Sequence, residues 1–156
     1  MPRTINAAAQ AIIKRAEHCR LRAYPDPGSG GAPWTIGWGA TGPDIHAGLV
    51  WTQAEADSRF AADLARLAAA IGLALGAAPT TDNQFGAMAS LAYNIGIGRF
   101  RGSSVLRFHL AGDHPEAAQA FTAWNKADGH VLPGLVTRRA AEAQLYLTPD
   151  ALVPAS

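Results

Sequence analysis

Residues 17–39 read EHCRLRAYPDPGSGGAPWTIGWG, and this stretch decides how the first third of the chain folds. It is dense in proline and glycine, which disfavour helices and long strands and favour turns. Within it, residues 34–36 (Trp-Thr-Ile) have the composition of a short strand. We therefore predict a small, irregular β-hairpin region over residues 23–39.

The segment before this stretch has the pattern of an amphipathic helix. Apolar residues recur there at helical spacing after two capping candidates, Thr4 and Asn6. We expect this helix to end near Leu21, with Glu17 in its last turns.

The rest of the chain is predicted to be helical. Thr52 and Glu55 match a capping box, in which a hydroxyl and a carboxylate each bind a free amide at a helix start. A long helix is therefore expected over about residues 53–75. Shorter helices are expected to begin at capping or turn signals: residues 80–82, Ser103, Pro115 and Leu135. The glycine at Gly96 is expected to end the first of these.

These patterns predict one α+β domain over residues 1–156, most of it helical. A small lobe of about residues 1–52 carries the β-hairpin region, residues 53–75 form a connecting helix, and a helical lobe spans about residues 80–147. No repeat, low-complexity tract or long linker separates a second domain.

Composition excludes several classes of protein. The chain has 13 Lys and Arg against 12 Asp and Glu, so it lacks the strongly basic surface that drives binding to nucleic acid or an anionic membrane. A single cysteine, Cys19, excludes an internal disulfide and a multi-cysteine zinc site. Residues 67–78, an apolar stretch without a charged residue, are too few to span a bilayer, and no secretory signal is recognisable. We expect a monomer without metal, cofactor or stable membrane insertion.

Only one of the four glutamates has no clear structural role. Three have a capping, helix-dipole or ion-pair role: Glu55, Glu116 and Glu142. Glu17 lies late in its helix, where the helix dipole disfavours a negative charge, directly before the hairpin region. It is a candidate catalytic acid. The alternative is a surface ion pair with Lys14 or Arg20.

Asp26 lies nine residues after Glu17, between Pro25 and Pro27. A Pro-Asp-Pro-Gly string is ordinary turn chemistry, which is one interpretation of this carboxylate. The other is catalytic, because an acid at a helix end and a carboxylate in a hairpin folding back over it are able to flank a sugar, as glycoside hydrolysis requires. That chemistry needs one carboxyl protonated and the other ionised.

Three motifs, in this order, resemble the bacteriophage lysozyme family, the muramidase endolysins. The first combines Glu17, Asp26 and Thr35 with a following Ile-Gly-Trp-Gly run. The second, residues 84–100, is a helix that ends in Asn-Ile-Gly and a Gly-Arg-Phe turn. The third, residues 132–142, reads LPGLVTRRAAE, so the motifs together cover nearly the whole chain.

The resemblance implies a lysozyme-like fold and cleavage of the β-1,4 bond between N-acetylmuramic acid and N-acetylglucosamine in peptidoglycan. By the family's pattern, Glu17 protonates the leaving glycosidic oxygen, while Asp26 and Thr35 position and activate the attacking water. Attack from the opposite face would invert the anomeric carbon and place the two carboxyl groups roughly 6.5–9.5 Å apart.

The family also implies a setting, phage-type host-cell lysis. The protein is expected in the cytoplasm of the producing cell and is expected to act on the cell wall in the periplasm after release by a separate membrane-permeabilising protein.

Further substrate-binding residues follow from the same resemblance. Thr41 is expected to line the cleft, or else to serve only as a turn residue before Gly42 and Pro43. Tyr93 is expected to contact substrate, or else to pack in the core. A hydroxyl after the Gly-Arg-Phe turn, from Ser103 or Ser104, completes this set. Four tryptophans are candidates either for stacking on sugar rings or for packing: Trp34, Trp38, Trp51 and Trp124.

The chain departs from the family pattern at three places. Eight residues separate Asp26 from Thr35, a longer loop than in shorter members of the family. Ala40 stands where the family commonly has histidine, and residues 18–19 read His-Cys in place of an acidic-Gly pair. The thiol is open to a redox interpretation, but a single helical cysteine is more commonly a small buried hydrophobe.

These departures keep a rival function open. It is a catalytically inactive, muramidase-like domain that binds peptidoglycan or a protein partner.

Overall fold

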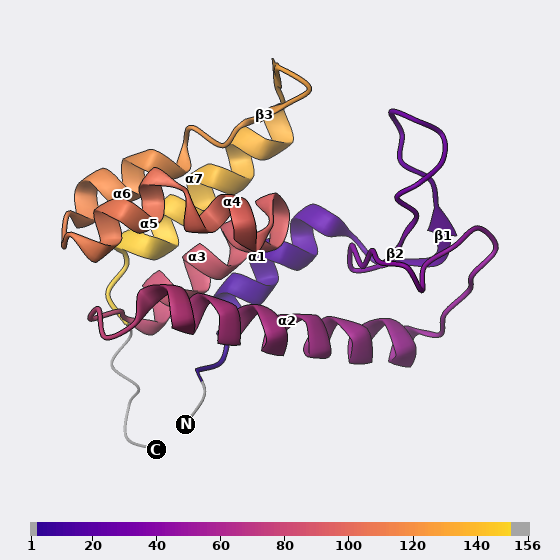
Figure 1. The fold of residues 1–156 in the computed structure, drawn as a ribbon, viewed down its shortest axis with the longest axis horizontal. Helices are drawn as coiled ribbons and strands as arrows, with labels where there is room; N and C mark the ends of the chain where they lie inside the picture. The colour runs from indigo at the N-terminus through magenta and orange to yellow at the C-terminus, as the bar shows by residue number, and fades with distance from the viewer. Residues whose placement is uncertain (1–2, 151–156) are drawn as a thin grey trace. The chain divides into compact units, whose positions relative to one another are not determined.

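The computed structural model describes residues 3–150, which form a mostly helical α+β fold (Figure 1). The predicted fold class is therefore confirmed. The chain divides into two compact units. We call Lys14–Arg66 the hairpin unit, and the residues up to Ile13 together with those from Leu67 onward the helical unit.

The hairpin unit is built around two short antiparallel strands, β1 (Arg20–Tyr24) and β2 (Thr35–Gly37). Arg20 pairs with Gly37 and Tyr24 pairs with Thr35, with an irregularity of register between the two pairs. The predicted hairpin is therefore confirmed, although β2 begins one residue later than the expected strand.

A small apolar core holds this hairpin. Its buried members are Ala23, Ile36, Ala40 and Ile45, and three larger apolar residues pack against them: Trp34, Leu49 and Trp51. The backbones of Ile36 and Ala40 exchange two hydrogen bonds, of 3.0 and 2.8 Å. Ala40 is thus held by its backbone and by burial, so the hairpin turn closes without the histidine common in the family.

The first helix, α1 (Ala7–Glu17), ends earlier than expected. His18 adopts a left-handed conformation with φ 56°, which cannot continue a helix, and Arg20 already belongs to β1. The expectation of an end near Leu21 is therefore wrong, because the Leu21 carbonyl instead accepts a hydrogen bond from the backbone N–H of Trp51. Pairing with distant residues has overridden the helical pattern.

The long helix α2 (Gln53–Leu75) has the predicted bounds. Its capping box is present: the Glu55 N–H donates to the Thr52 hydroxyl, and the Glu55 carboxylate accepts from the Thr52 N–H, both at 3.1 Å. These two bonds satisfy amides that the first helical turn would otherwise leave unpaired.

The helical unit contains five further helices. They are α3 (Asp82–Ile95), α4 (Ile97–Arg101), α5 (Ser104–Leu110), α6 (His114–Phe121) and α7 (Pro133–Leu147). Within this unit α7 packs against α3 and α6, and α5 packs against α6. Gly96, with φ 91°, ends α3 as predicted. The sequence patterns do not predict α4 as a separate helix. They also do not predict the small hairpin of β3 (Lys126–Ala127) and β4 (His130–Val131), in which each strand has two residues.

A buried ionic network joins α3 to α7. The Glu142 carboxylate, with no exposed surface, pairs with Nε of Arg138 at 3.2 Å and with Nε of Arg139 at 2.7 Å. It also accepts a hydrogen bond from the Ser90 hydroxyl, and Arg138 donates to the Ser90 carbonyl at 2.9 Å. The Arg-Arg-x-x-Glu part of the third motif therefore braces these two helices.

Candidate functional site

Glu17 is the last residue of α1, and its half-buried carboxyl group lies against the backbone of Gly39. A Cβ built on Gly39 would be only 2.7 Å from the Glu17 Oε2 atom, well inside van der Waals contact. Gly39 also has φ +92°, a conformation that glycine adopts without strain. The Ile-Gly-Trp-Gly run is thus what allows the backbone to approach this carboxyl group.

Thr35 and Glu17 are linked through a residue that sequence reasoning missed, Tyr24. The Tyr24 phenol lies within interaction range of the Thr35 side chain and of Glu17. Burial, and then the Glu17 carboxylate, raise the pKa of the Tyr24 phenol, against the opposing effect of Arg20. The Cζ atom of Arg20 lies 5.0 Å from the centre of the Tyr24 ring. The phenol is therefore protonated at neutral pH.

The signal that would have found Tyr24 is strand register. Once the Tyr-Pro-Asp stretch pairs with Trp-Thr-Ile-Gly, Tyr24 stands opposite Thr35. Side chains of directly opposed residues on antiparallel strands lie on the same face of the sheet.

Asp26 follows β1, and its recorded hydrogen bonds lie within its own loop. Its carboxylate accepts a bond from the Ser29 N–H at 3.0 Å, while its backbone N–H and carbonyl bond to Gly31 and Gly30 at 2.9 and 2.8 Å. These bonds agree with the turn interpretation of Asp26, and its catalytic role stays a prediction. The long segment between Asp26 and Thr35 folds into a compact turn instead of extending.

Thr41 lies exposed on the loop after the hairpin. Its carbonyl accepts a hydrogen bond from Arg59 of α2 at 2.9 Å, and the same guanidinium pairs with Asp44 at 2.8 Å and Asp63 at 2.9 Å. Arg59 thus fastens this loop to α2 and leaves the Thr41 side chain on the surface.

Trp38, in the middle of the Ile-Gly-Trp-Gly run, is fixed against α2. Its indole N–H donates to Asp57 at 2.8 Å, and its ring centre lies 6.1 Å from that of Phe60. Hydrogen bonds from Trp38, and then from Gln53, hold the pKa of Asp57 below its usual range. The packing interpretation of this tryptophan is the one the contacts support.

Cys19 is half-buried, so the expectation of a buried hydrophobe is met only in part. The amide of Gln53 donates to its sulfur at 3.6 Å. Within residues 3–150, no group of three His, Cys, Asp or Glu side chains is arranged to hold a metal ion.

The helical unit carries the other two predicted residues. Tyr93 is half-buried on α3. Ser103 is buried at the N-cap of α5, where its hydroxyl accepts from the Leu106 N–H at 3.2 Å and donates to the Phe100 carbonyl at 2.7 Å. Both of these bonds are to backbone groups, so capping α5 is the role that the structure gives to this hydroxyl.

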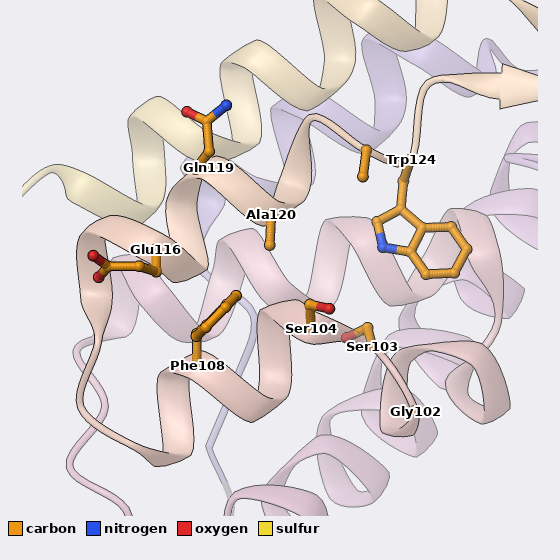
Figure 2. A pocket seen from close by; sticks show the side chains of 9 residues that line it. Gly102, Ser103, Ser104, Phe108, Glu116, Gln119, Ala120 and Trp124 are labelled. Carbon is orange, nitrogen blue, oxygen red and sulfur yellow. The ribbon is translucent and has the colours of Figure 1, made fainter.

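A pocket of about 580 Å³ opens beside Ser103 (Figure 2). It lies between α5 and α6 and is lined by Gly102, Ser103, Ser104, Phe108, Glu116, Gln119, Ala120, Ala123 and Trp124. Figure 2 shows the Trp124 indole beside Ser103 and Ser104, with Phe108 and Glu116 at the opposite end. An aromatic face next to hydroxyl groups suits a polar ligand that also has apolar surface, such as a sugar or peptide.

The described part of the chain contains no candidate membrane-spanning helix. None of its helices is both long enough and apolar enough to cross a membrane.

Comparisons with known proteins agree with the sequence motifs. The profile of the Phage lysozyme family matches residues 14–142. The endolysin of Bacillus phage PZA is 37% identical over 142 residues, covering 91% of this chain and 54% of that protein. The chain therefore spans about half the length of the Bacillus phage endolysins that it matches.

Solved structures give the same picture. The muramidase domain of SpmX from Asticaccaulis excentricus has a TM-score of 0.83 and 38% identity, covering 94% of this chain and 100% of that one. An endolysin from Escherichia coli O157:H7 phage FAHEc1 has a TM-score of 0.81 and 32% identity, covering 98% of each chain.

Proposed function

Because the chain belongs to the phage lysozyme family, we propose that it is a peptidoglycan hydrolase. The bond cleaved is the β-1,4 linkage between N-acetylmuramic acid and N-acetylglucosamine. The observation that carries this proposal is the position of Glu17, whose carboxyl group lies against Gly39 and within electrostatic range of the Tyr24 phenol, the register partner of Thr35. A potential acid and a potential water-binding hydroxyl thus belong to one small network.

The proposed mechanism is inverting hydrolysis. Glu17 donates a proton to the leaving glycosidic oxygen, and Asp26 and Thr35 hold and activate the water that attacks the anomeric carbon. Asp26 accepts one hydrogen bond from the Ser29 N–H, which fixes the direction of its carboxylate within the loop. No step of this mechanism calls for a metal or cofactor.

Each unit, taken by itself, is also proposed to carry residues that contact substrate outside the reacting bond. Thr41 contributes from the hairpin unit, and Tyr93 contributes from α3. The pocket between α5 and α6 takes a further part of the peptidoglycan, with Trp124 as its aromatic wall. Of the two serines there, Ser104 is the better candidate for substrate binding, because the Ser103 hydroxyl already bonds two backbone groups.

The setting we propose is phage-type lysis of a host cell. The protein is made in the cytoplasm, is released by a separate membrane-permeabilising protein, and acts as a monomer on the wall in the periplasm. The endolysin names of its relatives support this setting.

The test is digestion of purified peptidoglycan by wild type and Glu17→Gln, with mass spectrometry of the released fragments. We expect wild type to release fragments ending in reducing N-acetylmuramic acid and the variant to release none, because glutamine keeps the volume but has no proton to donate. Circular dichroism and a wall-binding assay check that the variant is folded and still binds. A folded wild type that binds the wall without releasing fragments would instead support the inactive binding domain.

A further inference from the structure

We infer that Tyr24 is a positioning residue for the proposed hydrolysis: its phenol orients the Thr35 hydroxyl toward the attacking water. This inference rests on the proposed function and adds a residue to it. Tyr24 acts through Thr35 and is not assigned a contact with substrate.

The backbone puts the two side chains together. Tyr24 is the last residue of β1 and Thr35 the first of β2, and the two are register partners. Opposed residues of an antiparallel pair project to the same face, so the phenol and the threonine hydroxyl lie on one side of the hairpin within interaction range of each other.

The phenol itself is held from two further sides. The Arg20 guanidinium lies over its ring, and Glu17 lies within electrostatic range. Tyr24 is half-buried, and Pro25, which follows it, has a fixed φ and restricts Tyr24 to extended backbone. A tyrosine confined in this way offers a fixed hydrogen-bond partner, which a mobile surface tyrosine does not.

A fixed partner matters because the threonine hydroxyl is a rotor. It has one donor hydrogen and two acceptor lone pairs, and rotation about the Cβ–Oγ1 bond decides where they point. A hydrogen bond with Tyr24 removes most of that freedom. The remaining hydrogen-bonding capacity of Thr35 then has a defined direction, as a water held for in-line attack requires.

The experiment is a double-mutant cycle on the full chain, with kcat and KM measured on soluble peptidoglycan fragments. Tyr24→Phe is expected to lower kcat about tenfold, the effect of one lost hydrogen bond, and to leave KM within about twofold. Thr35→Val is expected to lower kcat further. The double variant should be no slower than Thr35→Val alone, because Tyr24 acts only through the threonine hydroxyl.

Thr35→Ser guards against a folding defect in Thr35→Val. Serine keeps the hydroxyl, so Tyr24→Phe should still lower kcat about tenfold in that background.

Tyr146→Phe is the matched control, because it removes a buried phenol that bonds His109 in the helical unit. It should lower the thermal midpoint and leave kcat unchanged. A Tyr24→Phe variant as fast as wild type would overturn the inference, and so would independent, multiplying effects of Tyr24→Phe and Thr35→Val. If Glu17→Gln hydrolysed peptidoglycan as fast as wild type, the proposed function itself would be overturned. Failure of the inference about Tyr24 and failure of the proposed function are therefore distinguishable.

Discussion

Gly39 leaves room for the Glu17 carboxyl group, and one added methyl group is expected to displace it. In Gly39→Ala the new Cβ would lie 2.7 Å from the Glu17 Oε2 atom. We expect at least a tenfold loss of peptidoglycan hydrolysis, because a misplaced acid no longer reaches the leaving oxygen. The φ of +92° adds a backbone strain of about 1 kcal/mol, which urea unfolding would measure.

Gly48→Ala separates these two effects. Gly48 has a similar φ of +85°, but nothing lies within 4 Å of an added Cβ. Both variants should lose about the same stability, and only Gly39→Ala should lose activity. Equal activities would show that Gly39 has no part in placing Glu17.

His109 is expected to make the stability of the helical unit depend on pH. It is 2% exposed, its Nδ1 meets the Tyr146 hydroxyl at 2.6 Å, and its Nε2 meets the Thr80 hydroxyl at 2.8 Å. Burial, together with the stacked His114, lowers its pKa to about 4. Between pH 6.5 and 4, the His109 imidazole is therefore protonated in the unfolded chain and neutral in the folded chain. Stability should fall by about 3 kcal/mol between pH 6.5 and 4.

Urea midpoints at pH 7 and pH 4.5 measure this effect. His109→Gln should lose most of the pH dependence attributable to this side chain. His130→Gln, at an exposed position of β4, should retain it. If His109→Gln and wild type lose the same stability on acidification, the buried histidine is not the group that responds.

At the scale of elements, the N-cap of α5 distinguishes two roles for neighbouring serines. Ser103→Ala removes the cap and the bond to the Phe100 carbonyl, so unfolding free energy should fall by about 1–2 kcal/mol. Ser104→Ala, at a half-buried position inside the helix, should change stability by less than about 0.5 kcal/mol. If Ser104 contacts substrate as proposed, that variant raises KM. A larger loss of stability in Ser104→Ala than in Ser103→Ala would contradict the assignment of Ser103 as the N-cap.

The elements that were predicted correctly are those whose ends are determined locally. The capping box of Thr52 and Glu55 and the glycine at Gly96 act over three or four residues, so the sequence reveals them. The end of α1 is different, because pairing of Arg20 with Gly37 decides it. Residues far apart in sequence make that contact, and no local pattern predicts it.

In the candidate site, too, local motifs are visible in the sequence and contacts between distant residues are not. Glu17, Asp26 and Thr35 were proposed from motifs, and their roles are still proposals. Tyr24 was missed because its place beside Thr35 depends on the register of two strands separated by an irregular loop. The family motif predicts that the Ser103 hydroxyl contacts substrate, whereas its two bonds to the backbone depend on the three-dimensional path of the turn before α5.

At the scale of the whole molecule, breaking the buried network of α3 and α7 should cost more stability than removing a surface carboxylate. Glu142→Gln removes the charged carboxylate that two buried guanidinium groups share, and we expect a loss of about 3–5 kcal/mol in unfolding free energy. Glu116→Gln, on the exposed surface of α6, should change it by less than about 0.5 kcal/mol. Urea unfolding of both variants measures the difference, and similar values would show that the network adds little.

The network also limits the order in which mutations can be accepted during evolution. Its one carboxylate pairs with both arginines, so losing Arg138 or Arg139 leaves one of these two ion pairs in place. Losing Glu142 first breaks both pairs at once. A lineage that replaces this polar cluster by an apolar core therefore loses less stability along the way if an arginine changes before the glutamate.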